Sequence, residues 1–139
     1  MTDEPLFLTL DEVLRLHDYQ IEQFGGSGAV LDLGKLESAI AQPCASFGGA
    51  YLHEDLAAMA AAYLFHIVQN HPFEDGNKRT GTHAAIVFLA LNSYELDIPV
   101  DEAEQLVLRV AQGQAQKSDI AAFFRHLINE QYPQRESNR

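Results

Sequence analysis

The chain has 139 residues, of which 47% are hydrophobic and 21% charged, as is typical of one globular domain. Its formal net charge of -11 excludes a general nucleic-acid-binding surface, because phosphate backbones require basic patches. The single cysteine, Cys44, excludes an intramolecular disulfide and a cysteine-based zinc site. The sequence has no long apolar run and no signal sequence, which predicts a cytoplasmic protein without a membrane span.

Apolar residues recur at helical spacing in six segments of the chain. These segments span residues 10–24, 33–40, 54–69, 78–91, 101–112 and 119–130. A capping box of Thr9 and Glu12 opens the first helix, and we expect Asp32 and Ser118 to cap the second and the last. The third and fourth helices carry charge only at their first residues, so both are expected to lie in the core.

The segments between these helices are expected to be irregular, with two exceptions. Residues 44–53 are typical of a loop or a small hairpin, and residues 94–99 alternate as in an extended segment or a short edge strand. The polar segment 134–139 is expected to fray. The pattern therefore predicts a single all-α domain of about six helices with a small hairpin.

The strongest functional signal is the polar loop His71–Arg79, which joins the two expected core helices. The fourth helix begins at about Asn77, so its first N–H groups lack acceptors within the helix and can bind an anion. Lys78 and Arg79 lie in this first turn, where cations oppose the helix dipole unless an anion is held beside them. Gly76 permits a tight turn and close approach of a ligand. We therefore predict a phosphate site; a capped helix start with a surface charge cluster is the alternative.

Further side chains of the same loop suit chemistry on a nucleotide. His71 carries an imidazole, the side chain most often used as a general base, and can take a proton from a hydroxyl nucleophile. Asp75 is a carboxylate suited to Mg²⁺ that is shared with phosphates, and Phe73 is expected to anchor the loop in the core. A metal hydrolase that uses His66, His71 and Asp75 is an alternative, although these residues lack the spacing of known zinc sites. His66 is otherwise expected to be a core or lining histidine. His17 lies on the apolar stripe of the first helix, where it is expected to be a core residue or to line the site.

The segment from His71 to Thr80 resembles, position by position, the His-x-Phe-x-Asp-Gly-Asn-x-Arg signature of the Fic/Doc (Fido) superfamily. Four flanking segments resemble the death-on-curing (Doc) branch of that superfamily: residues 16–18, 24–26, 32–37 and 87–92. The resemblance covers residues 6–128 and leaves 129–139 as a C-terminal tail. It implies an all-helical Fido domain in which residues 44–53 form a flap that docks a target protein in an extended form.

The resemblance also implies an enzyme that transfers part of ATP to a hydroxyl group of a protein. It makes His71 the base that deprotonates this hydroxyl and Asp75 the Mg²⁺ ligand. It further implies an anion hole for the phosphates of ATP, formed by Gly76, Asn77, Lys78 and Arg79. ATP and Mg²⁺ are therefore the expected cofactors.

Two positions favour phosphorylation over adenylylation. Fic adenylyltransferases have glycine at the position of Lys78, and at the position of Thr82 a second arginine that grips the β and γ phosphates. Doc toxins share the lysine and bind ATP inverted, so that the γ phosphate faces the histidine. The resemblance thus implies a type II toxin that phosphorylates a threonine or serine, with elongation factor Tu as the expected target, and that inhibits translation.

A toxin of this kind is held in check by a partner, and the chain lacks the Ser/Thr-x-x-x-Glu-Gly/Asn motif of an internal inhibitory helix. A small separate antitoxin is therefore expected. Gln69 and His83 depart from the Doc pattern, since a basic residue and an asparagine are found at these positions in a Doc toxin. Two alternatives stay open: a Fic-type adenylyltransferase, and a non-catalytic binding protein with a relic Fido loop.

Overall fold

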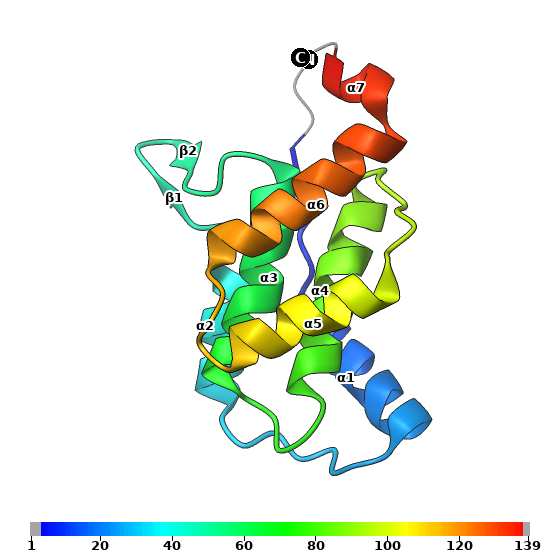
Figure 1. Cartoon of the computed structure of the whole chain (residues 1–139). Helices are drawn as coiled ribbons and strands as arrows, with labels where there is room; N and C mark the ends of the chain where they lie inside the picture. The colour runs from blue at the N-terminus through cyan, green and yellow to red at the C-terminus, as the bar shows by residue number, and fades with distance from the viewer. Residues whose placement is uncertain (1–3, 138–139) are drawn as a thin grey trace.

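The computed structural model describes residues 4–137, which contain seven helices and one β-hairpin (Figure 1). In chain order the elements are α1 (Leu10–Phe24), α2 (Leu33–Ala41), β1 (Ser46–Phe47), β2 (Ala50–Tyr51), α3 (Leu56–Asn70), α4 (Asn77–Leu91), α5 (Val100–Ala111), α6 (Lys117–Gln131) and α7 (Pro133–Ser137). The predicted all-α fold with a hairpin within residues 44–53 is confirmed. Every helix in the described range is too short or too polar to cross a membrane.

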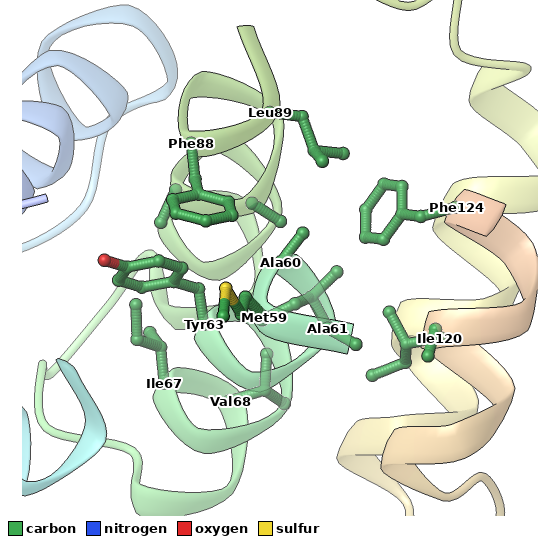
Figure 2. Close-up of a cluster of buried hydrophobic side chains, with 14 of the residues drawn as sticks. Met59, Ala60, Ala61, Tyr63, Ile67, Val68, Phe88, Leu89, Ile120 and Phe124 are labelled. Atoms are coloured by element: carbon green, nitrogen blue, oxygen red, sulfur yellow. The ribbon is translucent and has the colours of Figure 1, made fainter. Parts of the chain in front are cut away.

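Helices α3 and α4 form the centre of the fold, as their lack of interior charge predicts. Helices α2 and α6 pack against α3, and α1 packs against α4 (Figure 1). Gly81 of α4 permits close contact with α3, because a Cβ atom at this position would lie 3.2 Å from the Leu64 carbonyl oxygen. Figure 2 shows the core between these helices, where the rings of Tyr63 and Phe88 lie 5.2 Å apart between centroids. The loop 71–76 is thereby fixed at one end of the central pair.

Side-chain caps define where the first two helices begin. The Thr9 hydroxyl accepts the N–H of Glu12 at 3.1 Å, and the Glu12 carboxylate accepts the N–H of Thr9 at 2.8 Å. The Asp32 carboxylate accepts the N–H of Lys35 at 3.0 Å. Both caps were predicted from the residue types, and both are confirmed.

Two other helix starts differ from the prediction. Helix α3 begins at Leu56 instead of Glu54, because the Asp55 carboxylate accepts the N–H of Ala58 at 2.8 Å and acts as its cap. The prediction that Ser118 caps the last helix is wrong. Helix α6 begins one residue before Ser118, where the Asp119 carboxylate accepts the N–H of Gln116 at 2.7 Å.

Of the two predictions for residues 94–99, an extended segment or an edge strand, the edge strand is wrong, since these residues form no strand. Their backbone groups bond to side chains of the α6 C-terminus instead of to another strand. The Tyr132 hydroxyl donates to the Glu95 carbonyl oxygen at 2.8 Å, and the Gln131 amide donates to that of Asp97 at 2.9 Å. Because these partners satisfy the backbone, the alternating pattern forms no sheet.

The prediction that the tail frays is wrong as far as residue 137. Residues Pro133–Ser137 form α7, so the structure has one helix more than predicted. The Arg135 guanidinium lies 5.1 Å from the Tyr94 ring centroid and 4.6 Å from that of Tyr132, and it donates to the Ser93 carbonyl oxygen. These contacts attach α7 to the bundle. The last two residues of the predicted tail lie outside the described residues.

Three partly buried ionisable residues connect the hairpin segment (residues 44–53) with α3 and α6: His53, His66 and Lys117. The Lys117 Nζ atom lies 3.0 Å from Nε2 of His53 and 3.1 Å from Nε2 of His66. Burial, followed by the charges of Lys117 and His53, lowers the pKa of His66 to about 4. Burial and the Lys117 charge also lower the pKa of His53. Both imidazoles are therefore neutral at pH 7 and can accept hydrogen bonds from the Lys117 ammonium.

The pKa of His66 predicts how stability depends on pH. The unfolded chain binds a proton at His66 near pH 6.5, whereas the folded chain does so only near pH 4. The free energy of unfolding should therefore fall as the pH drops through this range, by about 1–2 kcal/mol after allowance for partial exposure. The His66→Gln variant keeps an acceptor for Lys117 but cannot ionise. Melting curves from pH 7 to pH 4 should show a smaller loss in this variant, and an equal loss would contradict the assignment.

Candidate active site

The segment His71–Arg79, called the signature loop from here on, begins directly after the last residue of α3. Its first residue, His71, adopts a left-handed backbone conformation with φ 49° and ψ 57°, and its N–H donates to the Ile67 carbonyl oxygen at 3.1 Å. Glycine is the usual residue here, because a side chain in this conformation costs about 1 kcal/mol. Within residues 4–137 no partner hydrogen-bonds the exposed His71 imidazole. The chain thus carries a strained histidine whose ring is available to a ligand.

Phe73 and Asn77 hold the loop in shape from the inside. Phe73 is fully buried, and its ring stacks on His17 with 3.7 Å between the ring centroids. The Asn77 side chain accepts the Phe73 N–H at 3.0 Å and donates to the Phe73 carbonyl oxygen at 2.8 Å. Asn77 was predicted to bind phosphate, but this side chain is buried and already bonded. The backbone N–H of Asn77 is left for an anion.

The segment 25–32, which connects α1 to α2, runs alongside the loop. The Leu31 N–H donates to the Pro72 carbonyl oxygen at 2.8 Å, and the Glu74 N–H donates to the Ala29 carbonyl oxygen at 3.1 Å. These backbone contacts satisfy polar groups of two irregular segments at once. The sequence contains no periodic signal for this pairing, and it was not predicted.

Asp75 is fixed at its backbone and at one carboxylate oxygen. Its Oδ2 atom accepts the Ser27 N–H at 2.7 Å, and its carbonyl oxygen lies 2.8 Å from Nε2 of His17. Gly26 allows this approach, because a Cβ atom there would lie 3.0 Å from the Asp75 Cβ. The Oδ1 atom has no hydrogen-bond partner among the described residues. One free carboxylate oxygen beside a phosphate site fits Mg²⁺, which is commonly bound by one or two carboxylates, substrate phosphates and water.

The N-terminus of α4 forms the polar end of the site. Gly76 precedes the helix with a left-handed backbone at φ 84°, and no side chain of residues 4–137 caps the helix. The first bonded N–H is that of Thr80, which donates to the Gly76 carbonyl oxygen at 2.9 Å. In the described part of the chain, the N–H groups of residues 76–79 have no acceptor. They and the helix dipole can bind an anion.

Lys78 and Arg79 add positive charge to this helix start. Both are exposed, and neither forms an ion pair with a described carboxylate, although the chain carries a net charge of -11. The Arg79 guanidinium lies 4.2 Å from the centroid of the Phe24 ring. Two cations at the positive end of a helix dipole are unfavourable without an anion. The arrangement can therefore hold the phosphates of a nucleotide.

Three residues differ from the Fic or Doc pattern, and each contacts a backbone carbonyl oxygen: Thr82, His83 and Gln69. The Thr82 hydroxyl donates to the Lys78 carbonyl oxygen at 2.8 Å, and Nδ1 of His83 lies 3.1 Å from the Arg79 carbonyl oxygen. The Gln69 amide donates to the Val110 carbonyl oxygen at 2.6 Å and thereby joins α3 to α5. None of these contacts adds a cation to the site.

The metal hydrolase alternative is not supported by the positions of its residues. His66 contacts Lys117 in the cluster beside the hairpin segment, whereas His71 and Asp75 lie in the signature loop. Across residues 4–137 no group of three or more histidine, cysteine or acidic side chains is arranged to hold a metal ion.

Comparisons with known proteins agree with this geometry. The model of the Fic/DOC family matches residues 7–89, which include the whole signature loop. A protein described as Toxin Doc from Mycolicibacterium smegmatis is 42% identical over 101 residues, covering 71% of this chain and 78% of the relative. A protein described as Protein kinase doc from Escherichia phage P1 is 32% identical over 118 residues, covering 84% of this chain and 91% of the relative.

Proposed function

Because the chain belongs to the Fic/DOC family, and within it to the Doc branch, we propose that it is a toxin that transfers the γ phosphate of ATP to a protein hydroxyl. The observation that carries this proposal is the start of α4, where no described side chain caps the helix and no described carboxylate pairs with Lys78 or Arg79. The names of the relatives support both parts of it, since one is described as a toxin and another as a protein kinase.

The proposed reaction uses His71 as a general base. Its imidazole takes the proton from a serine or threonine hydroxyl as that oxygen attacks the γ phosphorus. The bond between the γ phosphorus and the bridging oxygen breaks, and ADP leaves. The N–H groups of residues 76–79 and the two cations of the first turn bind the phosphate oxygens throughout. Mg²⁺ bound to Asp75 and to the phosphates would neutralise part of their charge.

The orientation of ATP is proposed from two positions in α4. Lys78 places a cation in the first turn, close to the N–H groups, whereas Thr82 supplies no charge one turn later. The positive charge is therefore concentrated beside the loop instead of being spread along the helix. This distribution supports binding with the γ phosphate next to His71, as in the Doc branch.

The target and the partner are part of the same proposal. Elongation factor Tu is the expected target, and a small separate antitoxin the expected inhibitor, both through the Doc resemblance. The hairpin of β1 and β2 pairs Phe47 with Ala50 and leaves the Phe47 side chain 82% exposed, so it is available to contact an extended segment of a target. Phosphorylation of the factor would stop translation in the cytoplasm.

The experiment that tests the proposal is a transfer assay with two labels. The purified chain is incubated with elongation factor Tu, Mg²⁺ and ATP labelled on either the α or the γ phosphate. We expect label on the factor only from γ-labelled ATP. Transfer from α-labelled ATP would instead establish adenylylation, and transfer from neither would remove this factor as the target.

A growth assay separates catalysis from binding. Expression of the wild-type chain should arrest growth, whereas the His71→Ala variant should not. Equal arrest by both would favour the non-catalytic binding protein, because the base is then dispensable.

A further inference from the structure

The peptide bond between Asp75 and Gly76 is held by a side chain from a different helix. His17 lies on α1, is 1% exposed, and has its Nε2 atom 2.8 Å from the Asp75 carbonyl oxygen. A carbonyl oxygen only accepts hydrogen bonds, so Nε2 must carry the proton. The imidazole also lies directly beneath the turn, since a Cβ atom on Gly76 would be 3.4 Å from its Cδ2 atom.

This hydrogen bond fixes the direction of the Gly76 N–H group. In a trans peptide the carbonyl and the following N–H point to opposite sides. The Asp75 carbonyl faces the buried His17, so the Gly76 N–H faces away from the interface of α1 and α4. It is one of the N–H groups at the start of α4 that have no acceptor among the described residues. The His17 hydrogen bond therefore aims this donor at the proposed phosphate site.

Without that hydrogen bond, the Asp75–Gly76 peptide has an alternative orientation. Glycine accepts positive and negative φ with similar ease, so rotation of the preceding peptide plane meets little steric resistance from Gly76. Rotation by about half a turn would replace the outward N–H with an outward carbonyl oxygen. A partial negative charge would then face the phosphates, and a hydrogen-bond donor would be lost.

We propose that His17 is a positioning residue of the phosphate site, which prevents this peptide rotation. The inference rests on the proposed function, because it assumes that the start of α4 binds phosphate. His17 is buried and is not placed to touch the substrate. It has a second role in the core, where its ring stacks on Phe73 at an interplanar angle of 6°. The two roles can be separated by substitution.

The test compares three variants on the same buried face of α1. His17→Phe keeps an aromatic ring against Phe73 but lacks the donor, whereas His17→Gln keeps an N–H donor near the position of Nε2 and lacks the ring. Gln20→Leu is the matched control, because Gln20 is equally buried and its side-chain amide has no partner in the described structure. For each protein, the dissociation constant of Mg-ATP is measured by calorimetry and the melting temperature by circular dichroism.

We expect His17→Phe to weaken Mg-ATP binding by roughly 10- to 100-fold, as for loss of a hydrogen bond to a charged group. His17→Gln should bind more tightly than His17→Phe even if it melts at a lower temperature, and Gln20→Leu should bind like the wild type. Wild-type affinity in a folded His17→Phe variant would overturn the inference. The inference would also be overturned if the loss of Mg-ATP affinity in both His17 variants were proportional to the drop in their melting temperatures.

A measurement on the unmodified chain keeps the inference testable if the variants fail to fold. Nitrogen NMR of the wild type should show His17 protonated at Nε2, and inorganic phosphate should shift the Gly76 amide resonance. An Nε2 atom without a proton would overturn the role of His17. A wild-type chain that binds neither phosphate nor Mg-ATP would instead overturn the proposed function itself.

Discussion

Replacement of His71 with alanine is expected to reduce the rate of phosphate transfer by about 100- to 10,000-fold, the usual contribution of a general base. The affinity for Mg-ATP should change little, because the proposed phosphate ligands are the N–H groups and cations of α4. The imidazole has no hydrogen-bond partner in residues 4–137, so its removal breaks no hydrogen bond there. Single-turnover rates and calorimetric affinities measured on the same preparations would test both parts.

Two control variants separate the loss of the base from other effects at His71. Asparagine tolerates the left-handed backbone at this position but has no group that titrates near neutrality, so His71→Asn should fold well and be as inactive as His71→Ala. His126→Ala removes an exposed histidine of α6 and should keep full activity. Full transfer activity in His71→Asn would exclude His71 as the base.

Replacement of Phe73 with alanine should lower the free energy of unfolding by about 3–5 kcal/mol, the usual cost for a buried phenylalanine. Phe73 is fully buried and stacked on His17, and its backbone is bonded to the Asn77 side chain. The cavity would remove the packing that shapes the loop, so binding of Mg-ATP should weaken as well. Urea denaturation of the wild type and the variant would give the difference in free energy.

Two further variants test whether the loss of stability comes from the buried ring of Phe73. Phe73→Leu retains most of the apolar volume and should cost less than Phe73→Ala. Phe47→Ala removes a phenylalanine that is 82% exposed at the hairpin and should leave stability almost unchanged. A Phe73→Ala variant as stable as the Phe47→Ala variant would contradict the role of Phe73 as the anchor of the loop.

Periodicity and capping chemistry were sufficient to predict most of the fold. The capping box of Thr9 and the Asp32 cap are confirmed, and the central position of α3 and α4 follows from their uncharged interiors. The start of α6 was mispredicted for a physical reason. Serine is a common cap, but here the Asp119 carboxylate inside the helix accepts the N–H that precedes it. Residue preference alone cannot tell these two caps apart.

Segments held by long-range hydrogen bonds could not be predicted. The backbone of residues 94–99 bonds to side chains near residue 131, and α7 depends on the contacts of Arg135 with two tyrosine rings. No local pattern encodes such partners. The same limit applies to the site, where the burial of His17 was expected from its place on an apolar stripe but its bond to Asp75 was not.

The polar groups at the α4 N-terminus were more predictable than the contacts that support the loop. The orphan N–H groups at the start of α4 follow from any helix that begins there, and Lys78 and Arg79 are read directly from the sequence. The use of the Asn77 side chain within the loop became visible only in the structure. A side chain that bonds its own loop and one that bonds a ligand have the same sequence pattern.

A crystal structure of the chain with Mg²⁺ and a non-hydrolysable ATP analogue would test the central claim most directly. We predict that the phosphate oxygens accept the N–H groups of residues 76–79, that Arg79 contacts them, and that the γ phosphate lies nearest the His71 imidazole. An analogue whose phosphates bind away from the α4 N-terminus would contradict the phosphate site. An analogue bound there with its α phosphate nearest His71 would contradict phosphorylation.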